Sequence, residues 1–236
     1  MNDPLVIIPG LLSDARIVLP QMLAVGEKMG VIVSLPLQGH SVEPMAEAVL
    51  HACPQRFALM GLGLGGVVAL EVMRRAGDRI TRVIFVGTDP LPEDPKVAAE
   101  REVRMVAVRA GRLGEMLMHD VCVGSGPDAE FAMDVQRDMA FDLGEGVYLR
   151  QSRALQRRPD QQKTLRKAHV PTLILAGEAD TIVPRRRTEF LAAMMPHGCL
   201  EFIPGAGHLP QLEQPEAVTG ALRTFLAGRL PTLMLG

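Results

Sequence analysis

Short apolar segments recur along the chain and alternate with longer amphipathic segments. Six runs are dominated by aliphatic side chains and bounded by Gly, Pro or polar residues: Leu5–Ile8, Val31–Leu35, Phe57–Met60, Arg82–Val86, Leu173–Ala176 and Leu200–Ile203. Runs of this kind are typical of strands buried on both faces. Helical patterns lie between most of them, at Ile17–Val25, Pro44–Ala52, Leu64–Ala76, Arg186–Met195 and, at the end, Pro215–Ala227. This alternation predicts an α/β fold with a doubly wound, mainly parallel sheet.

One interval interrupts the alternation. Residues 89–168 contain no convincing strand but several helical stretches, namely Val97–Ala110, Arg112–Val121 and Ala129–Phe141. We interpret this interval as a helical lid inserted after the fourth strand, with a core formed by residues 1–88 and 169–236. Nine apolar lid residues are candidates for lining a cavity: Met105, Val106, Leu113, Met116, Leu117, Met118, Phe131, Met133 and Met139. An apolar lid indicates an uncharged acyl or alkyl substrate rather than a highly charged one.

The length, charge and cysteine content of the chain limit its size class, its binding partners and its compartment. The 236 residues are enough for one domain with an insertion. Lys and Arg total 25 against 27 Asp and Glu, so no strong net charge favours nucleic acid, and a small molecule is the expected partner. Cys53, Cys122 and Cys199 are widely spaced, which argues against disulfides or structural zinc and favours a cytoplasmic protein. We find no signal peptide, no membrane span and no cofactor motif that the other features support; the oligomeric state is not indicated.

A glycine-rich turn follows the third predicted strand. The segment Gly61-Leu62-Gly63-Leu64-Gly65-Gly66 leads directly into an apolar helix, which is the strand-turn-helix order of a nucleophile elbow, small-x-Ser-x-Gly. Gly63 stands where that pattern has serine. The same glycines also fit the GxGxxG dinucleotide loop, but that loop usually follows the first strand and is followed about 20 residues later by an acid, whereas Asp89 lies 28 residues after Gly61. The elbow is favoured; a dinucleotide loop and a purely structural turn stay open.

Three further segments end predicted strands with residues suited to acyl chemistry. Asp180, in Gly177-Glu178-Ala179-Asp180, can orient a histidine, and His208, on the glycine-rich loop after the last strand, can act as a general base. Pro9-Gly10-Leu11 follows the first strand, so the backbone N–H of Leu11, with that of Leu64, is a candidate oxyanion hole. Asp89 is a reserve candidate for the orienting acid. Each segment alone also fits an ordinary turn or cap.

Taken together, these motifs resemble the α/β-hydrolase superfamily, in particular compact bacterial lid-bearing esterase-like members. The resemblance covers nearly the whole chain and is most specific at GLGLGG, at GEADTIVP around Asp180 and at GAGHLPQLEQPEAV around His208. It implies a Ser-Asp-His mechanism on a carboxylic ester, lactone or related acyl substrate, without metal or cofactor. Only four residues precede Leu5, so we expect a trimmed sheet of about six strands.

The missing hydroxyl at Gly63 leaves three hypotheses. Glycine offers no nucleophile, so the chain is expected to be inactive or severely impaired as an esterase, whether the change is engineered or natural. The second hypothesis is a small-molecule-binding pseudo-hydrolase without turnover. The third is chemistry that depends on His208 but not on a nucleophile, of the lyase or oxygenase kind.

Overall fold

A single parallel sheet runs through the middle of the molecule in the computed structural model, which describes residues 3–121, 123–126 and 128–228. Cys122, one of the three cysteines whose spacing argues against disulfides and structural zinc, therefore lies outside the described residues. The six strands lie in the order β2-β1-β3-β4-β5-β6, and every neighbouring pair is parallel. Their bounds are β1 Leu5–Ile8, β2 Val31–Val33, β3 Phe57–Leu62, β4 Ile80–Val86, β5 Thr172–Gly177 and β6 Gly198–Ile203. The predicted doubly wound sheet of six strands is confirmed.

The aliphatic runs form strands because both faces of the sheet are covered. All residues of β1, β3 and β5 are buried, whereas those of the edge strand β2 are only partly buried. β2 ends two residues before the predicted Leu35, shortly before Pro36, whose nitrogen has no hydrogen to donate to a ladder. The fully buried central strands carry the two large apolar clusters, one on each face of the sheet.

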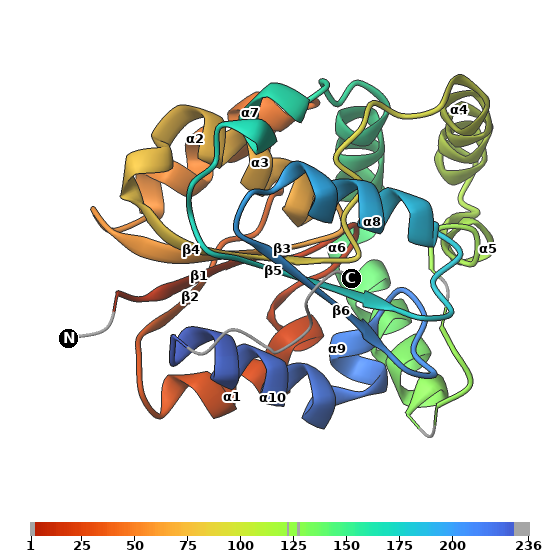
Figure 1. The fold of residues 1–236 in the computed structure, drawn as a ribbon. Coiled ribbons are helices and arrows are strands. Elements are labelled where there is room, and N and C mark those ends of the chain that lie inside the picture. Colours follow the sequence, from red (N-terminus) through yellow and green to blue (C-terminus); the bar gives the residue numbers. More distant parts are fainter. Residues whose placement is uncertain (1–2, 122, 127, 229–236) are drawn as a thin grey trace.

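Helices cover the two faces unequally, as Figure 1 shows. On one face lie α2 (Val42–Ala52), α3 (Leu64–Ala76), α7 (Gln162–Arg166) and α8 (Arg185–Met194). On the other lie α1 (Leu19–Gly26), α9 (Pro210–Glu213) and α10 (Pro215–Leu226). Two short 3-10 helices, η1 (Ala15–Val18) and η2 (Gly77–Arg79), precede α1 and β4. The alternation of strand and crossover helix thus produces the three layers expected of a doubly wound fold.

The described residues between β4 and β5, where the sequence predicts an insertion, form four helices. They are α4 (Pro95–Arg109), α5 (Leu113–Leu117), α6 (Ala129–Gln156) and the short α7; we call residues 89–168 the helical insertion. α6 is interrupted at Gly144, whose φ of 77° and ψ of 176° are not helical. Two helical stretches meet at a kink there, and the first of them ends close to the predicted end at Phe141. α4, α5 and α6 gather beyond one end of the sheet in Figure 1.

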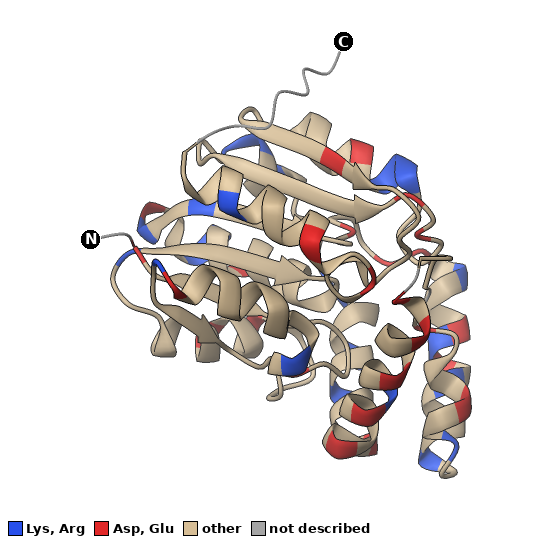
Figure 2. Ribbon diagram, turned by 90° about the horizontal axis from the view of Figure 1, so that it is seen from below, with Lys and Arg blue, Asp and Glu red and all other residues tan. Residues whose placement is uncertain are grey.

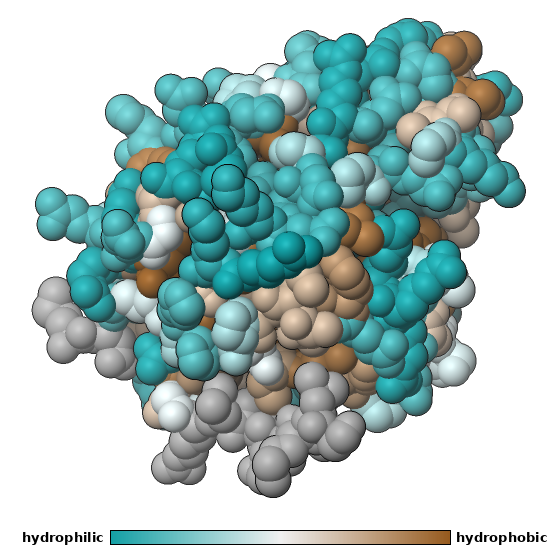
Figure 3. Space-filling view, turned by 45° about the horizontal axis from the view of Figure 1, so that its top comes forward, coloured by the Kyte–Doolittle hydropathy of each residue, from teal (hydrophilic) through white to brown (hydrophobic). Residues whose placement is uncertain are grey.

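Charged side chains are distributed unevenly over these layers. In Figure 2 the strands are almost free of charged residues, while acidic and basic residues alternate along helices of the insertion. Hydrophilic residues cover most of the face seen in Figure 3, and an apolar area lies near its centre. Within the described residues, no helix combines the length and the apolar character needed to cross a membrane.

The turn between β3 and α3 is packed too closely for side chains at three of its glycines. A Cβ at Gly65 would overlap the carbonyl oxygens of Ile8 and Pro9, and one at Gly66 would overlap Thr88. A Cβ at Gly61 would lie 2.5 Å from the carbonyl oxygen of Gly65. These contacts bring α3 against the ends of β1 and β4, which fixes the position of the turn relative to both strands.

The close approach predicts that Gly65→Ala is strongly destabilising. Because the added methyl group would meet backbone rather than a movable side chain, we expect the free energy of unfolding in urea to fall by about 3 kcal/mol or more. Gly77→Ala is the matched control, because Gly77 has helical φ and ψ. Apart from its own chain neighbours, no atom of the described residues lies within 4 Å of a Cβ added there. That variant should be unchanged or up to about 1 kcal/mol more stable. Equal effects of the two changes would contradict the packing argument.

Candidate active site

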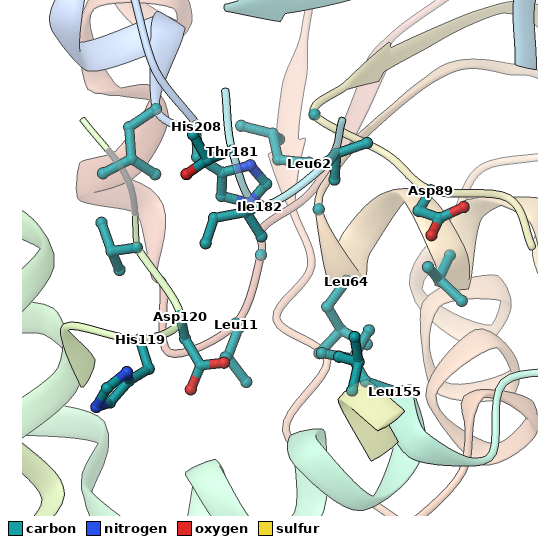
Figure 4. A pocket seen from close by; sticks show the side chains of 18 of the residues that line it. Leu11, Leu62, Leu64, Asp89, His119, Asp120, Leu155, Thr181, Ile182 and His208 are labelled. Carbon is teal, nitrogen blue, oxygen red and sulfur yellow. The ribbon is translucent and has the colours of Figure 1, made fainter. Parts of the chain in front are cut away.

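A cavity of about 420 Å³ opens where the strands end, between the core and the helical insertion. The core side of its wall includes Gly10, Leu11, Gly63, Leu64 and His208, which come from the segments after β1, β3 and β6. Ligands of doubly wound sheets bind at the carboxyl ends of strands, and the volume suits a small organic molecule. Figure 4 shows His208, Leu11 and Leu64 around this cavity.

Gly63 has the strained backbone of an elbow but space for a side chain. Its φ of 50° and ψ of −114° are costly for other residues, and its N–H donates to the Val86 carbonyl oxygen at 2.9 Å. Among the described residues, and apart from its chain neighbours, the only atom within 4 Å of an added Cβ is His208 Nε2, at 3.5 Å. A side chain at this position would therefore project toward the histidine, unlike one at Gly61, Gly65 or Gly66.

Asp180 and His208 meet although they follow different strands. His208 Nδ1 lies 2.8 Å from Asp180 Oδ2, and the side chains are 15% and 1% exposed. The other Asp180 oxygen accepts N–H groups of Ile182 and Val183 at 2.8 and 3.0 Å, so the carboxylate cannot rotate freely. A carboxylate acceptor favours hydrogen on Nδ1 and leaves Nε2 as the acceptor that faces Gly63.

Opposing effects set the pKa of His208. Burial disfavours the charged imidazolium, but the negative charge and hydrogen bond of Asp180, with smaller contributions from Glu213 and Asp120, outweigh it and raise the pKa above its ordinary value. The ring is therefore a stronger base than a histidine in water.

The two candidate oxyanion donors lie on the same wall. Leu64 is the first residue of α3, where backbone N–H groups have no partner within the helix, and Leu11 belongs to the turn after β1. The hydrogen bonds between described residues outside regular elements use neither N–H. Parallel pairing of Ile8 with Gly61 places the two turns next to each other. The backbone could thus offer two donors to one oxygen.

Two glutamines of the insertion hold the Leu11 turn, and sequence reasoning missed both. Leu12 has a left-handed φ of 48°, which is unfavourable for leucine. Its N–H donates to Gln151 Oε1 at 2.8 Å, and its carbonyl oxygen accepts Gln136 Nε2 at 3.0 Å. Both glutamines are buried in α6. No motif in the sequence marks them, because the contacts span more than 120 residues.

Glu213 was also missed, although it lies within the motif around His208. Its side chain is fully buried, and it accepts the N–H of Gly207 at 2.9 Å and of Leu209 at 2.9 Å, the residues on either side of the histidine. It also accepts the N–H of Gly124 at 2.5 Å. The signal in the sequence was an acidic residue five positions after the histidine, within the same motif. Glu213 braces the His208 loop and ties it to the insertion.

Asp89, the reserve candidate for the orienting acid, pairs with an arginine and not with His208. Its Oδ2 lies 3.1 Å from Arg158 and its Oδ1 accepts the N–H of Leu91 at 3.1 Å. In Figure 4 Asp89 lies on the far side of Leu64 from Asp120. The geometry brings Asp180, and not Asp89, to His208.

The apolar lining expected from the insertion is mostly wrong. Of the nine candidate residues, only Leu117 lines the pocket. Met105, Leu113 and Met139 are buried in apolar clusters, because helix packing turns these faces inward. Three others are exposed: Val106, Met118 and Phe131. The insertion side of the pocket instead combines other apolar residues, Val97, Val121 and Leu155, with a larger number of charged residues.

Known proteins resemble the chain over most of its length. The sequence model of the alpha/beta hydrolase family matches residues 5–221. The chain is 35% identical over 213 residues to the pimeloyl-[acyl-carrier protein] methyl ester esterase of Xanthomonas axonopodis pv. citri, covering 83% of each protein. It is 25% identical over 214 residues to the biotin biosynthesis bifunctional protein BioHC of Teredinibacter turnerae; the match covers 81% of this chain and only 37% of that longer protein. A thermophilic esterase from Thermogutta terrifontis, solved with malate bound, has a TM-score of 0.86 and 26% identity, covering 97% of this chain and 90% of that one.

The bracing by Glu213 predicts that Glu213→Gln is destabilising despite its equal size. An amide would turn NH₂ donors toward backbone N–H donors, so we expect the free energy of unfolding to fall by about 2 kcal/mol. Glu216→Gln, at an exposed position three residues later, should change it by less than about 0.5 kcal/mol. Urea denaturation followed by circular dichroism measures both, and equal losses would exclude the bracing role.

Proposed function

The chain belongs to the α/β-hydrolase family, and we propose that its pocket is a site for hydrolysis of a carboxylic ester or lactone in which Gly63 replaces the attacking serine. The proposal includes Asp180 and His208 as acid and base and the N–H groups of Leu11 and Leu64 as oxyanion hole. The esterases among its relatives and structural neighbours support the reaction class.

One observation carries the proposal: an added Cβ at Gly63 would lie 3.5 Å from His208 Nε2 and within 4 Å of no other atom of the described residues outside its chain neighbours. His208 is already oriented by Asp180. A base held in the correct tautomer, beside an elbow with room for a short side chain, is the arrangement of an activated nucleophile.

With serine restored, each group has a defined step. His208 Nε2 takes the hydroxyl proton as the oxygen attacks the ester carbonyl, and the charge of the tetrahedral intermediate falls on an oxygen near the Leu11 and Leu64 N–H groups. The protonated His208 then gives its proton to the leaving alcohol as the C–O bond breaks. Water, activated by the same histidine, cleaves the acyl-enzyme and regenerates the hydroxyl.

In the present chain the acyl-enzyme route is closed, because Gly63 has no oxygen. A site that keeps only its oxyanion hole and binding groups retains roughly 10³ to 10⁴-fold catalysis over water. A second candidate is direct activation of water or substrate by His208, which is favoured by the space that Gly63 leaves beside Nε2. A chain that binds such molecules without turnover is the remaining alternative.

The first test is the Gly63→Ser variant, assayed with short p-nitrophenyl esters and lactones beside the present chain. We expect kcat/KM to rise by at least about 10³-fold, because the variant supplies the one missing group. Gly63→Ala is the matched control, since it adds the Cβ without the oxygen and should gain nothing. A folded but inert Gly63→Ser variant would remove the main support for an esterase. Turnover by the present chain that His208→Ala abolishes would favour the second candidate.

The second test concerns the acid and the pH dependence. Because Asp180 raises the pKa of His208, the neutral base forms only above the usual value of about 6.5, and kcat/KM of the Gly63→Ser variant should rise with pH through a midpoint above it. Adding Asp180→Asn should move this midpoint to lower pH and reduce kcat/KM on the order of 10³ to 10⁴-fold. Adding Asp89→Asn instead should leave the midpoint in place. A larger loss from Asp89→Asn would reverse the assignment.

A further inference from the structure

Seven charged residues that line the pocket, six from the insertion and Arg187 from α8, are linked by ion pairs in which arginines alternate with carboxylates. In order of contact they are Arg104, Asp120, Arg101, Glu93, Arg158, Asp89 and Arg187. The successive N–O distances are 3.7, 3.2, 2.9, 2.9, 3.1 and 3.9 Å. We call this set the charge chain.

The charge chain begins and ends with arginine, so four cations face three carboxylates. Each carboxylate lies between two arginines, whereas Arg104 and Arg187 have one long ion pair each. Asp94, Glu100 and Arg186 also line the pocket, but these three residues are exposed. Their charges are therefore screened by water and salt. The less exposed wall of the pocket therefore carries one positive charge in excess.

Arg104 is the least satisfied member of the charge chain. Its side chain is only 13% exposed, its buried Nε has no hydrogen-bond partner, and among the described residues the ion pair with Asp120 is its only polar contact. Asp120 is already engaged by Tyr148 at 2.7 Å and Arg101 at 3.2 Å. Leaving donors of a largely buried guanidinium unpaired is unfavourable, so Arg104 has hydrogen-bonding capacity for a ligand.

Arg104 lies on the catalytic side of the pocket. Its partner Asp120 points into the pocket near Leu11 in Figure 4. Asp120 is also close enough to His208 to contribute to its raised pKa. Arg187, at the other end of the charge chain, is more exposed, at 24%, and would bind an anion more weakly in the higher local dielectric.

We infer that the pocket takes an acyl substrate with a second, anionic end, a carboxylate, which Arg104 binds while the ester lies between Gly63 and His208. The inference rests on the proposed function for the position of the ester, but not for the binding of the anion. A guanidinium can hold a carboxylate through two parallel hydrogen bonds, and one excess charge matches a monoanion. The half ester of a dicarboxylic acid is the simplest such molecule. The inferred substrate is thus a monoanionic half ester, whereas the apolar residues of the insertion had indicated an uncharged acyl or alkyl substrate.

The binding test uses the present chain, where no turnover is required. We titrate it with monomethyl adipate and with neutral dimethyl adipate by isothermal calorimetry. The monoanion should bind at least about tenfold more tightly, and Arg104→Gln should remove a tenfold to hundredfold advantage, the range for hydrogen bonds to a charged group. Arg109→Gln, an exposed arginine on the same helix, is the matched control and should change nothing. The inference would be overturned if the present chain bound the two esters equally, or if the Arg104→Gln variant kept the whole preference for the monoanion.

Two further measurements separate this inference from folding defects and from the proposed function. Arg104→Lys keeps the positive charge but loses the two parallel N–H donors of the guanidinium, so it should retain part of the preference for the monoanion. Added salt should weaken the binding of the monoanion and leave that of the neutral diester unchanged. A preference that is insensitive to both changes would contradict the inference.

In the Gly63→Ser background the half ester should have a higher kcat/KM than the neutral diester, and Arg104→Gln should lower only the kcat/KM for the half ester. An inert Gly63→Ser variant with Arg104-dependent binding would refute the esterase but not the anion site. Hydrolysis of both esters independent of Arg104 would refute the anion site alone.

Discussion

The close approach of the β3–α3 turn to the ends of β1 and β4 is the constraint on which the site depends. Gly65 and Gly66 lie against the backbone of Ile8 and the side chain of Thr88, with no space for a Cβ. This contact puts the N-terminus of α3 beside the turn after β1, so that Leu11 and Leu64 line one cavity. Gly63 differs from its neighbours because only its φ, and not its surroundings, favours glycine. The packing that builds the elbow is therefore intact without a nucleophile.

Two buried carboxylates support His208 in different ways. Asp180 accepts from the imidazole and raises its pKa, whereas Glu213 accepts backbone N–H groups on either side of it. The Asp180 carboxylate determines which ring nitrogen of His208 carries the proton, and the Glu213 carboxylate fixes the position of the loop. Neither requirement is met by hydrophobic packing alone, because loops that carry glycine have few side chains with which to pack.

The core and the insertion contribute unlike halves to the pocket. The core supplies glycines, leucines and the histidine, which are suited to an acyl group and its carbonyl. The insertion supplies the charge chain except for Arg187, which belongs to α8. Through Gln136 and Gln151 it also supplies the hydrogen bonds that hold the strained Leu12 turn. The function and the anion site that we propose thus place ester chemistry and substrate choice in separate parts of the chain, with Arg104 as the cation for an anionic substrate.

The sequence by itself determined the layers and the positions of the chemical groups along the chain, because strand burial, glycine turns and strand-end residues are local patterns with a fixed period. It predicted six parallel strands, the elbow at Gly63, and Asp180 and His208 after two later strands. The tertiary structure alone decided which acid meets the histidine, since Asp180 and Asp89 both follow strands. It also decided the pocket lining, in which Met105 and Met139 turned into the core and arginines turned toward the cavity. Those outcomes depend on how helices rotate and pack across long separations in sequence, which a local pattern does not encode.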